Sequence, residues 1–320
     1  MMAETRDEYD VLRQTYTVLM LHFIEGMKQS DIAKHLNLST SKVNRLIASG
    51  QKAGMVKITI ESPFQRLMEV EKALLQKFRL AHAVVTPTLS GNPDTTLQQA
   101  GRAAANHLLE IVKNGDVIAI TGGRAVSAVV DHVAPEHGYR IRVVPLTGGV
   151  QGNYYTDVNH LAMQFAEKLG GAVSLIHAPL FAETQAQRDV LLDMASIRDV
   201  FDIARRATVA VVGVGAVEAS GSGYYDSIPD PDAQGFAARE VAGEFIAHLI
   251  RADGTLADVP LNSRVVALSP KDIAACPRVI GVASGPQKIG PLRAALAGNY
   301  LHSLVVDEAT AQGLLDSERS

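Results

Sequence analysis

Eight short runs rich in Val, Ile and Ala recur from about residue 81 onward, and most of them are separated by longer segments with helical spacing of apolar residues. The runs cover residues 83–87, 116–121, 141–146, 172–179, 208–214, 264–268, 279–283 and 303–307. Nearly continuous apolar runs are typical of strands buried on both faces, and parallel strands need helical crossovers between them. We therefore predict an α/β fold with a mostly parallel, doubly wound sheet.

The length and composition fit this sheet and leave room for a second domain. A chain of 320 residues is about two domains long. Its 47% of hydrophobic residues is enough for a large buried core. Amphipathic helices are predicted between the strands, for example over residues 97–112, 158–169 and 289–297.

The first part of the chain has a different spacing of apolar residues. Up to about residue 55, apolar residues recur at helical spacing in three groups, which predicts three short helices. Residues 56–60 (VKITI) alternate as a strand would, and an amphipathic helix over 67–78 follows the Ser62-Pro63 break. We predict a helix-turn-helix domain over 1–62, a linker helix within 63–80, and a sheet domain over 81–320.

Charge is divided unevenly between these parts. The whole chain has a net charge of −4, which argues against a general polyanion binder. Residues 1–60 carry eight basic and six acidic side chains, so this segment is net +2 and the remainder is net −6. Between residues 28 and 57, six basic residues stand against Asp31 alone. A small basic module before a large acidic one points to local nucleic-acid binding.

Residues 29–46 carry the most specific pattern. Ala33 is small where two helices must touch, Asn37 tolerates the left-handed turn, and Ser39 can cap the helix that follows. The alternative is an ordinary helix pair with a solvated basic face, but helix, turn, cap and charge agree on DNA binding. The predicted DNA contacts are the polar residues of the second helix and one lysine of a following wing: Thr40, Ser41, Lys42, Asn44, Arg45 and Lys57.

Glycine-containing loops follow three of the predicted strands. The carboxyl ends of parallel strands are where ligands bind, and backbone N–H groups at a helix N-terminus favour anions. A glycine pair alone is more often a tight turn, but it recurs here at two strand ends. The residues concerned are Thr121, Gly122, Gly123 and Arg124 in the first loop, Thr147, Gly148 and Gly149 in the second, and Ser284 to Lys288 in the third.

Seven blocks of this sequence together resemble the SorC family (DeoR-like, SorC-type) of bacterial sugar-responsive transcriptional regulators. They occur in the family's order over nearly the full chain: QSDIAKHLNLSTSKVNRLIASGQKAGMVKITI, DVIAITGGRAVSAV, VVPLTGGVQGNYYTDVN, IRDVFDIARRATVAVVGVG, VAGEFIAHLIRADGTLAD, LNSRVVALS and ASGPQKIGPLRAALAGNYLHSLVVDEATAQGLL. The resemblance implies a Rossmann-like effector domain similar to sugar-phosphate isomerases and deaminases. It also implies a homo-oligomer, a dimer or tetramer.

The resemblance also assigns roles to residues of the effector domain. It implies that Lys288 binds a phosphate of the effector and that Gly122 and Gly123 line the phosphate end. It places Asp157, Asn159 and Glu244 near sugar hydroxyls. This chain departs from many relatives in having Arg124 where a Ser or Thr follows the paired glycines, and Pro286 where the late loop usually has a second glycine.

We therefore expect a sequence-specific regulator of a carbohydrate or polyol catabolic operon, controlled by a sugar, sugar phosphate or polyol. In this account the effector changes the arrangement of the DNA-binding domains in the oligomer, and the 67–78 helix transmits the change and contributes a dimer contact. The alternative is a sugar-phosphate isomerase or deaminase with a DNA-binding appendage. We expect no enzyme, because none of His160, His177 and His248 lies in the Asp-x-His pattern of those enzymes; Glu218 and Asp226 are its candidate carboxylates.

The remaining expectations concern cofactors and location. No Cys or His set has zinc-ligand spacing, and the single Cys276 cannot form a disulfide within the chain, so we expect no metal and no cofactor. The start of the chain is acidic and polar, unlike a signal peptide, and the apolar runs are far shorter than a membrane helix. We expect a cytoplasmic protein whose partners are operator DNA, the effector and further copies of itself, with no membrane.

Overall fold

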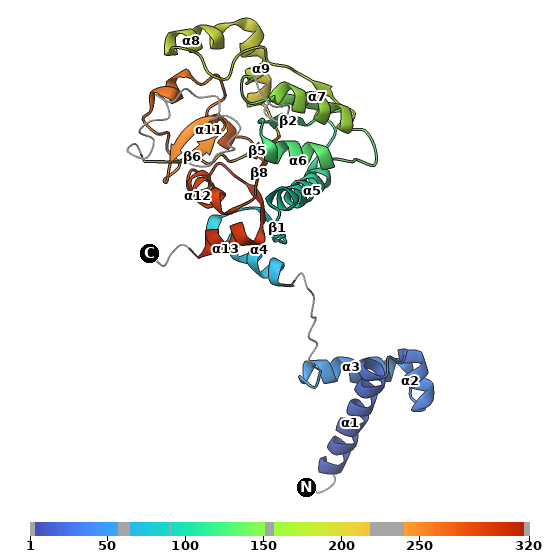
Figure 1. Ribbon diagram of the computed structural model, residues 1–320. Helices are drawn as coiled ribbons and strands as arrows, with labels where there is room; N and C mark the ends of the chain where they lie inside the picture. Colours follow the sequence, from blue (N-terminus) through green and yellow to red (C-terminus); the bar gives the residue numbers. More distant parts are fainter. Residues whose placement is uncertain (1–3, 57–64, 90, 151–156, 218–239, 317–320) are drawn as a thin grey trace. The chain divides into compact units, whose positions relative to one another are not determined.

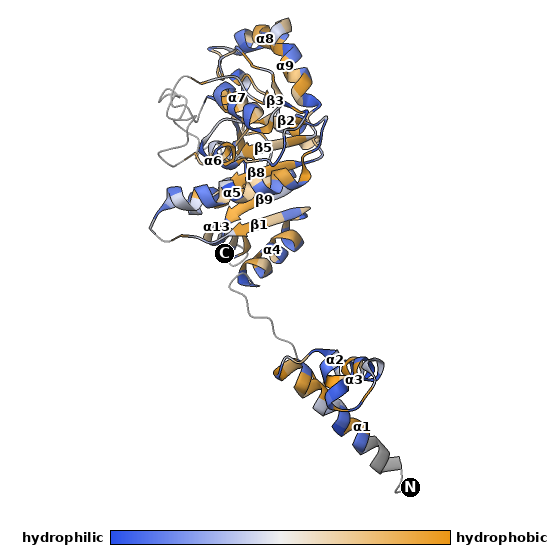
Figure 2. Ribbon diagram, turned by 90° about the vertical axis from the view of Figure 1, so that its right-hand side faces the viewer, coloured by the Kyte–Doolittle hydropathy of each residue, from blue (hydrophilic) through white to orange (hydrophobic). Residues whose placement is uncertain are grey.

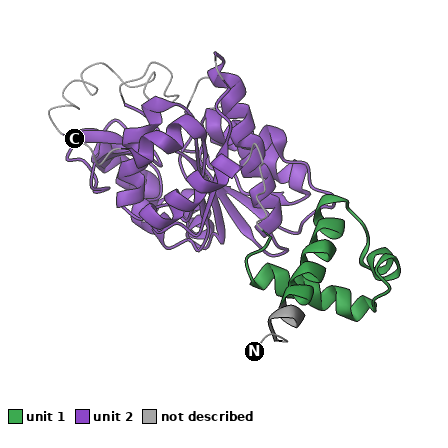
Figure 3. Ribbon diagram, turned by 90° about the horizontal axis from the view of Figure 1, so that it is seen from below, with its two compact units in different colours: residues 1–63 green, residues 64–320 purple. Residues whose placement is uncertain are grey.

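The computed structural model divides into two compact units, residues 1–63 and 64–320 (Figure 3). It describes residues 4–56, 65–89, 91–150, 157–217 and 240–316. None of the helices within these ranges has both the length and the apolar character that crossing a bilayer requires.

Unit 1 is helical. It contains α1 (Glu4–Leu19), a π-helical turn (Met20–Ile24), α2 (Gln29–His35) and α3 (Thr40–Lys52). The prediction of three helices is confirmed, although the first is longer than expected. A small core joins them, made of Val18, Leu19, Leu21, Ile32, Ala33, Val43, Leu46 and Ile47.

The turn between α2 and α3 has the predicted geometry. Asn37 has a φ of 54°, which is the left-handed conformation that Asn tolerates. The Ser39 side chain accepts a hydrogen bond of 3.2 Å from the Lys42 amide and so caps the first turn of α3. The predicted wing strand over residues 56–60 lies almost wholly outside the described residues.

Unit 2 is built on a seven-stranded sheet in which every pairing is parallel. The strand order is β1-β9-β8-β5-β2-β3-β4. The α/β prediction with a mostly parallel sheet is confirmed. The strands are β1 (His82–Thr86), β2 (Val117–Ile120), β3 (Arg142–Pro145), β4 (Ala172–Val173), β5 (Val209–Gly213), β8 (Val279–Ala283) and β9 (Ser303–Asp307).

Helices cover both faces of this sheet (Figures 1 and 2). One face carries α5 (Pro93–Ile111), α6 (Arg124–His132) and α7 (Val158–Leu169). Right-handed crossovers place α9 (Ala195–Arg205), α11 (Pro270–Ala274) and α12 (Ile289–Ala297) on the opposite face. Helices α4 (Gln65–Phe78), before β1, and α13 (Glu308–Leu315), after β9, lie in no crossover; they pack against β1 and against each other. Helix α8 (Gln185–Asp193) has no buried residue and packs against α9.

Two predicted strands differ from the structure. Residues 264–268 form no strand of the sheet, because Val265 and Ala267 make isolated antiparallel bridges to Phe181 and Thr147 instead. Residues 264–268 form backbone hydrogen bonds with Leu146, Gly148 and Leu180, in the segments that follow β3 and β4. Of the predicted strand 172–179, only the two residues of β4 have ladder pairing, since β4 is the edge strand beside β3 and the chain then turns away.

A hairpin that the sequence did not predict stands beside α12. It consists of β6 (Val241–Phe245) and β7 (His248–Arg251), joined by Ile246 and Ala247. Both joining residues have positive φ, 51° and 60°, where hairpin turns normally place Asn or Gly. The turn lacks its usual sequence signal, so surrounding contacts hold it: both residues are buried.

Helix α4, which lies within the predicted linker segment 63–80, packs as part of unit 2. Its buried side chains Leu67, Val70 and Leu74 belong to the main core of that unit. The helix contacts β1 and α13, and the Glu71 carboxylate accepts a hydrogen bond of 2.8 Å from the Val85 amide of edge strand β1. Unit 1 is therefore joined to a helix that packs on the sheet domain.

Candidate functional site

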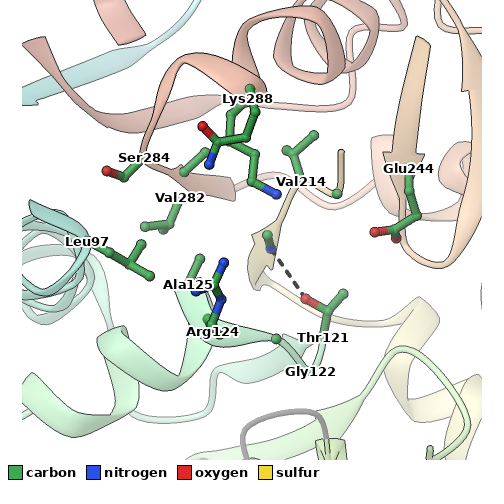
Figure 4. A pocket seen from close by; sticks show the side chains of 15 residues that line it. Leu97, Thr121, Gly122, Arg124, Ala125, Val214, Glu244, Val282, Ser284 and Lys288 are labelled. Carbon is green, nitrogen blue, oxygen red and sulfur yellow. Dashed lines mark hydrogen bonds between the residues drawn. The ribbon is translucent and has the colours of Figure 1, made fainter. Parts of the chain in front are cut away.

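A pocket opens at the carboxyl edge of the sheet, where the loops after β2, β5 and β8 come together (Figure 4). The strand ends and loops contribute residues 121–125, 213–215, 282–284 and 287–288, and Leu97 and Glu244 complete the lining. From β2 the chain continues to β3 and then β4, toward one edge of the sheet. Strand β5 lies on the other side of β2, and from it the chain continues to β8 and β9, toward the opposite edge. The pocket is thus at the switch point of the strand order, where ligands of open α/β sheets bind.

The first loop is fixed by a neighbouring strand and leads into α6. The Thr121 hydroxyl accepts a hydrogen bond of 3.3 Å from the Gly213 amide at the end of β5. Gly123, the N-cap of α6, has a φ of 114°, which only glycine adopts readily. Arg124 is the first residue of α6, and its guanidinium lies 3.8 Å from the exposed Asp94 carboxylate at the start of α5.

The third loop is held by a buried carboxylate that the sequence reasoning missed. Asp307 ends β9, is 1% exposed, and accepts a 2.9 Å hydrogen bond from the Gly285 amide. It also accepts hydrogen bonds from the hydroxyls of Thr88 and Thr310. Burial by itself would raise the pKa of Asp307, but these hydrogen bonds hold it below its usual value. The available signal was an Asp at a strand end with a Thr three residues on.

Glu244 of β6 is a buried carboxylate beside the pocket. The Ala247 amide donates a hydrogen bond to one of its oxygens, and the other lies over Gly215, where a Cβ atom would collide with it. Burial raises the pKa of Glu244 to about 7, although the Ala247 hydrogen bond and the Lys288 charge both lower it. The group therefore titrates near neutral pH.

Two cationic side chains point into the pocket from opposite loops, Lys288 from the third and Arg124 from the first (Figure 4). Burial lowers the pKa of Lys288; the Glu244 carboxylate opposes this shift and the Arg124 charge adds to it. A desolvated ammonium that faces a guanidinium is stabilised by an anion between them. The backbone at the start of α6 offers the N–H groups that an anion also prefers.

Five of the predicted effector residues come together here: Gly122, Gly123, Arg124, Glu244 and Lys288. The loop after β3 does not line this pocket. The Gly148 amide donates to the Val266 carbonyl, and a Cβ atom on Gly148 would lie 2.3 Å from the Pro179 oxygen. The Gly149 amide donates to the Ala178 carbonyl. The Thr147 hydroxyl is buried and has no hydrogen-bond partner among the described residues.

Asp157 and Asn159 also lie outside the lining of this pocket. Asp157 caps α7 by accepting from the amides of Asn159 and His160. The Asn159 side chain makes two hydrogen bonds to the backbone of Ile176, of 2.7 and 3.0 Å. Both side chains therefore have structural partners, and their contact with an effector stays a prediction.

The predicted DNA-binding face of α3 is polar and accessible. Thr40, Ser41, Asn44 and Arg45 are exposed and Lys42 is half-buried, while Val43, Leu46 and Ile47 of the same helix face the core. Lys57 lies outside the described residues, as do Glu218 and Asp226. Within the described ranges, no group of three or more His, Cys, Asp or Glu side chains is arranged to hold a metal ion.

Comparison with known proteins assigns the class. The family model for a sugar-binding domain, Sugar-bind, matches residues 62–316. The erythritol catabolism regulatory protein EryD of Brucella abortus is 32% identical over 298 residues, which cover 92% of this chain and 94% of EryD. The transcriptional regulator LsrR of Klebsiella pneumoniae is 30% identical over 306 residues, covering 93% of this chain and 91% of LsrR.

The solved structures agree on the fold. The full-length sorbitol operon regulator SorC from Klebsiella pneumoniae superposes with a TM-score of 0.76 at 24% identity, over 96% of this chain and 99% of SorC. The fold and the relatives define a transcriptional regulator with a sugar-binding domain, and not an enzyme. The chain belongs to the SorC family of such regulators, which control catabolic operons in response to an effector. The family resemblance seen in the sequence is confirmed.

The buried Glu244 carboxyl predicts a pH dependence of stability. Its pKa is about 7 in the folded chain against 4.5 ordinarily, so the folded chain binds the extra proton and stability falls as pH rises from about 4.5 to 7. Glu244→Gln removes this fall. The unfolding free energy of the variant relative to wild type should rise across that window by at most about 3 kcal/mol. Denaturant unfolding at several pH values measures it.

The control for this experiment is Glu167→Gln, which changes an exposed glutamate on α7. Its unfolding free energy should follow the wild-type pH profile. A Glu244→Gln profile parallel to wild type between pH 4.5 and 7 would show that this carboxyl has no raised pKa.

Proposed function

We propose that the pocket between the loops after β2, β5 and β8 is the effector site and that the effector carries an anionic group, as a sugar phosphate or polyol phosphate does. The observation that carries the proposal is the pair of cations, Arg124 and Lys288, that meet there from two different loops. A neutral sugar gains nothing from the positive potential that two neighbouring cations create in the pocket. An anion is attracted by both charges and can also accept hydrogen bonds from the N–H groups at the start of α6.

The other end of the effector meets groups suited to hydroxyls. Burial raises the pKa of Glu244 to about 7, so this carboxyl can accept a hydrogen bond when ionised and donate one when protonated. The Thr121 side chain also lines the pocket.

We include Thr147, Gly148, Gly149, Asp157 and Asn159 as a more distant part of the site. The Thr147 hydroxyl, which has no partner among the described residues, supports this extension. The name of EryD, an erythritol catabolism regulator, supports a polyol-derived effector.

In unit 1, α3 reads operator DNA. Its exposed face combines Asn44 and Arg45, which suit base edges in a major groove, with Lys42, which suits phosphates. Thr40, Ser41 and Lys57 complete the predicted contacts.

The two half-sites of an operator are normally bound by symmetric copies of one chain. We therefore propose that the chain acts as a dimer or tetramer, in the cytoplasm, where the operator lies.

The effector assignment predicts the behaviour of a lysine variant. Lys288→Ala should weaken binding of the best phosphorylated sugar or polyol in a panel by about tenfold or more, because a charge-assisted hydrogen bond is lost. Binding of neutral polyols should change much less. Isothermal titration calorimetry on the full chain measures both. Lys271→Ala, an exposed lysine on α11, is the control and should bind as wild type does. Equal affinities for Lys288→Ala and wild type would reject the site.

The DNA assignment predicts two different losses. Arg45→Ala should relax base preference at one half-site position, at a cost of about 1–3 kcal/mol on cognate DNA. Lys42→Ala should weaken cognate and random DNA alike and reduce the salt dependence, because it removes a phosphate contact. Fluorescence anisotropy at several salt concentrations separates them. The assignment of Arg45 fails if its variant loses the same affinity on cognate and random DNA.

A further inference from the structure

The pocket loop after β8 is physically joined to α4, the helix to which unit 1 is attached. Four residues make the connection in order, Gly285, Asp307, Glu308 and Arg66, and we refer to them as the relay. We propose that the relay couples effector binding to unit 1 and that its essential contact is the ion pair between Arg66 and Glu308. This proposal rests on the effector site proposed above.

The first contact joins the effector loop to the start of α13. The Gly285 amide donates hydrogen bonds of 2.9 Å to both the Asp307 carboxylate and the Thr310 hydroxyl. Asp307 and Thr310 are at most 1% exposed, so these bonds are shielded from water. Gly285 has a φ of 103° and lies three residues before Lys288. A shift of the loop when Lys288 meets an anion therefore acts directly on the N-cap of α13.

The body of α13 is also packed tightly on the same segment. A Cβ atom on Gly313 would lie 2.2 Å from the Ile289 Cδ1 atom, and Ile289 directly follows Lys288. The Arg293 guanidinium of α12 donates a 2.7 Å hydrogen bond to the Gly313 carbonyl. Close-packed contacts leave little room for α13 to stay in place while the loop and α12 move.

The second contact joins α13 to α4 at both ends. Arg66 in the first turn of α4 pairs with Glu308 in the first turn of α13. At the other end, the Lys77 ammonium donates a 3.0 Å hydrogen bond to the Leu315 carbonyl. Between these points, Glu71 holds α4 to the amide of Val85 on β1. A helix held at its middle and linked at both ends to a neighbour is expected to tilt with that neighbour.

The chain's connectivity links α4 to unit 1. Helix α4 begins at Gln65, and unit 1 ends at residue 63. Any change in the orientation of the first turn of α4 is therefore passed to the segment that leads to unit 1. Because Arg66 lies in that turn and its side chain is 74% exposed, removing it breaks the relay with little loss of core packing.

The test is hydrogen–deuterium exchange of the full chain with millimolar inorganic phosphate as the probe, against sodium chloride at equal ionic strength. In wild type, phosphate should slow exchange in residues 284–288 and in α4. Arg66→Ala should keep the phosphate affinity and the slower exchange of the loop. In α4, however, the decrease in exchange rate caused by phosphate should be about fivefold smaller than in wild type, a factor at the lower end of typical allosteric effects. Arg66→Lys retains the ion pair and should restore the effect.

Arg205→Ala is the matched control, because it removes an exposed arginine that pairs with Asp202 on α9, away from the relay. It should behave as wild type does. Equal slowing of α4 in Arg66→Ala and wild type would overturn the relay and leave the effector site standing, as would wild-type slowing confined to the loop. A wild-type loop that phosphate does not protect would overturn the effector site, and the relay with it.

Discussion

The parallel register of the sheet is the constraint on which the rest of unit 2 depends. Because β2, β5 and β8 are adjacent and parallel, their carboxyl ends meet at one edge and their loops have to share the space above it. The order of strands reverses between β2 and β5, so the chain leaves these two neighbouring strands in opposite directions along the sheet. The pocket, its glycine loop and its two cations follow from this arrangement.

Two buried carboxyls near the pocket show how local hydrogen bonding decides the charge of a site. Asp307 accepts hydrogen bonds from Gly285, Thr88 and Thr310, and its pKa is lowered in spite of burial. Glu244 accepts one from Ala247, and burial raises its pKa to about 7. The first group is a fixed anion that holds the pocket loop, and the second can change its protonation as the effector binds.

Much of the fold could be predicted because the sheet and the helix-turn-helix have strong local patterns. The strands carry nearly continuous apolar runs, and the Asn37 turn and Ser39 cap are visible in the sequence. The pocket was predicted in part. A glycine loop at a strand end can be recognised from the local sequence, but which of these loops lie side by side depends on the strand order, which the local sequence does not show. The loop after β3 carries the same glycine signal as that after β2, but it lies one strand further from β5 and packs against residues 178–179 and 266. The β6–β7 hairpin escaped prediction because Ile246 and Ala247 are held at positive φ by their surroundings.

The central claim is that one chain holds DNA and a small anion and that each changes the affinity for the other. Thermodynamic linkage makes this effect reciprocal. The most direct measurement is a calorimetric titration with a phosphorylated sugar or polyol that the chain binds. The ligand is titrated once into the free chain and once into the chain saturated with operator DNA. Operator DNA should change the effector affinity by the same factor by which the effector changes operator affinity. An effector affinity that is identical with and without operator DNA would contradict it.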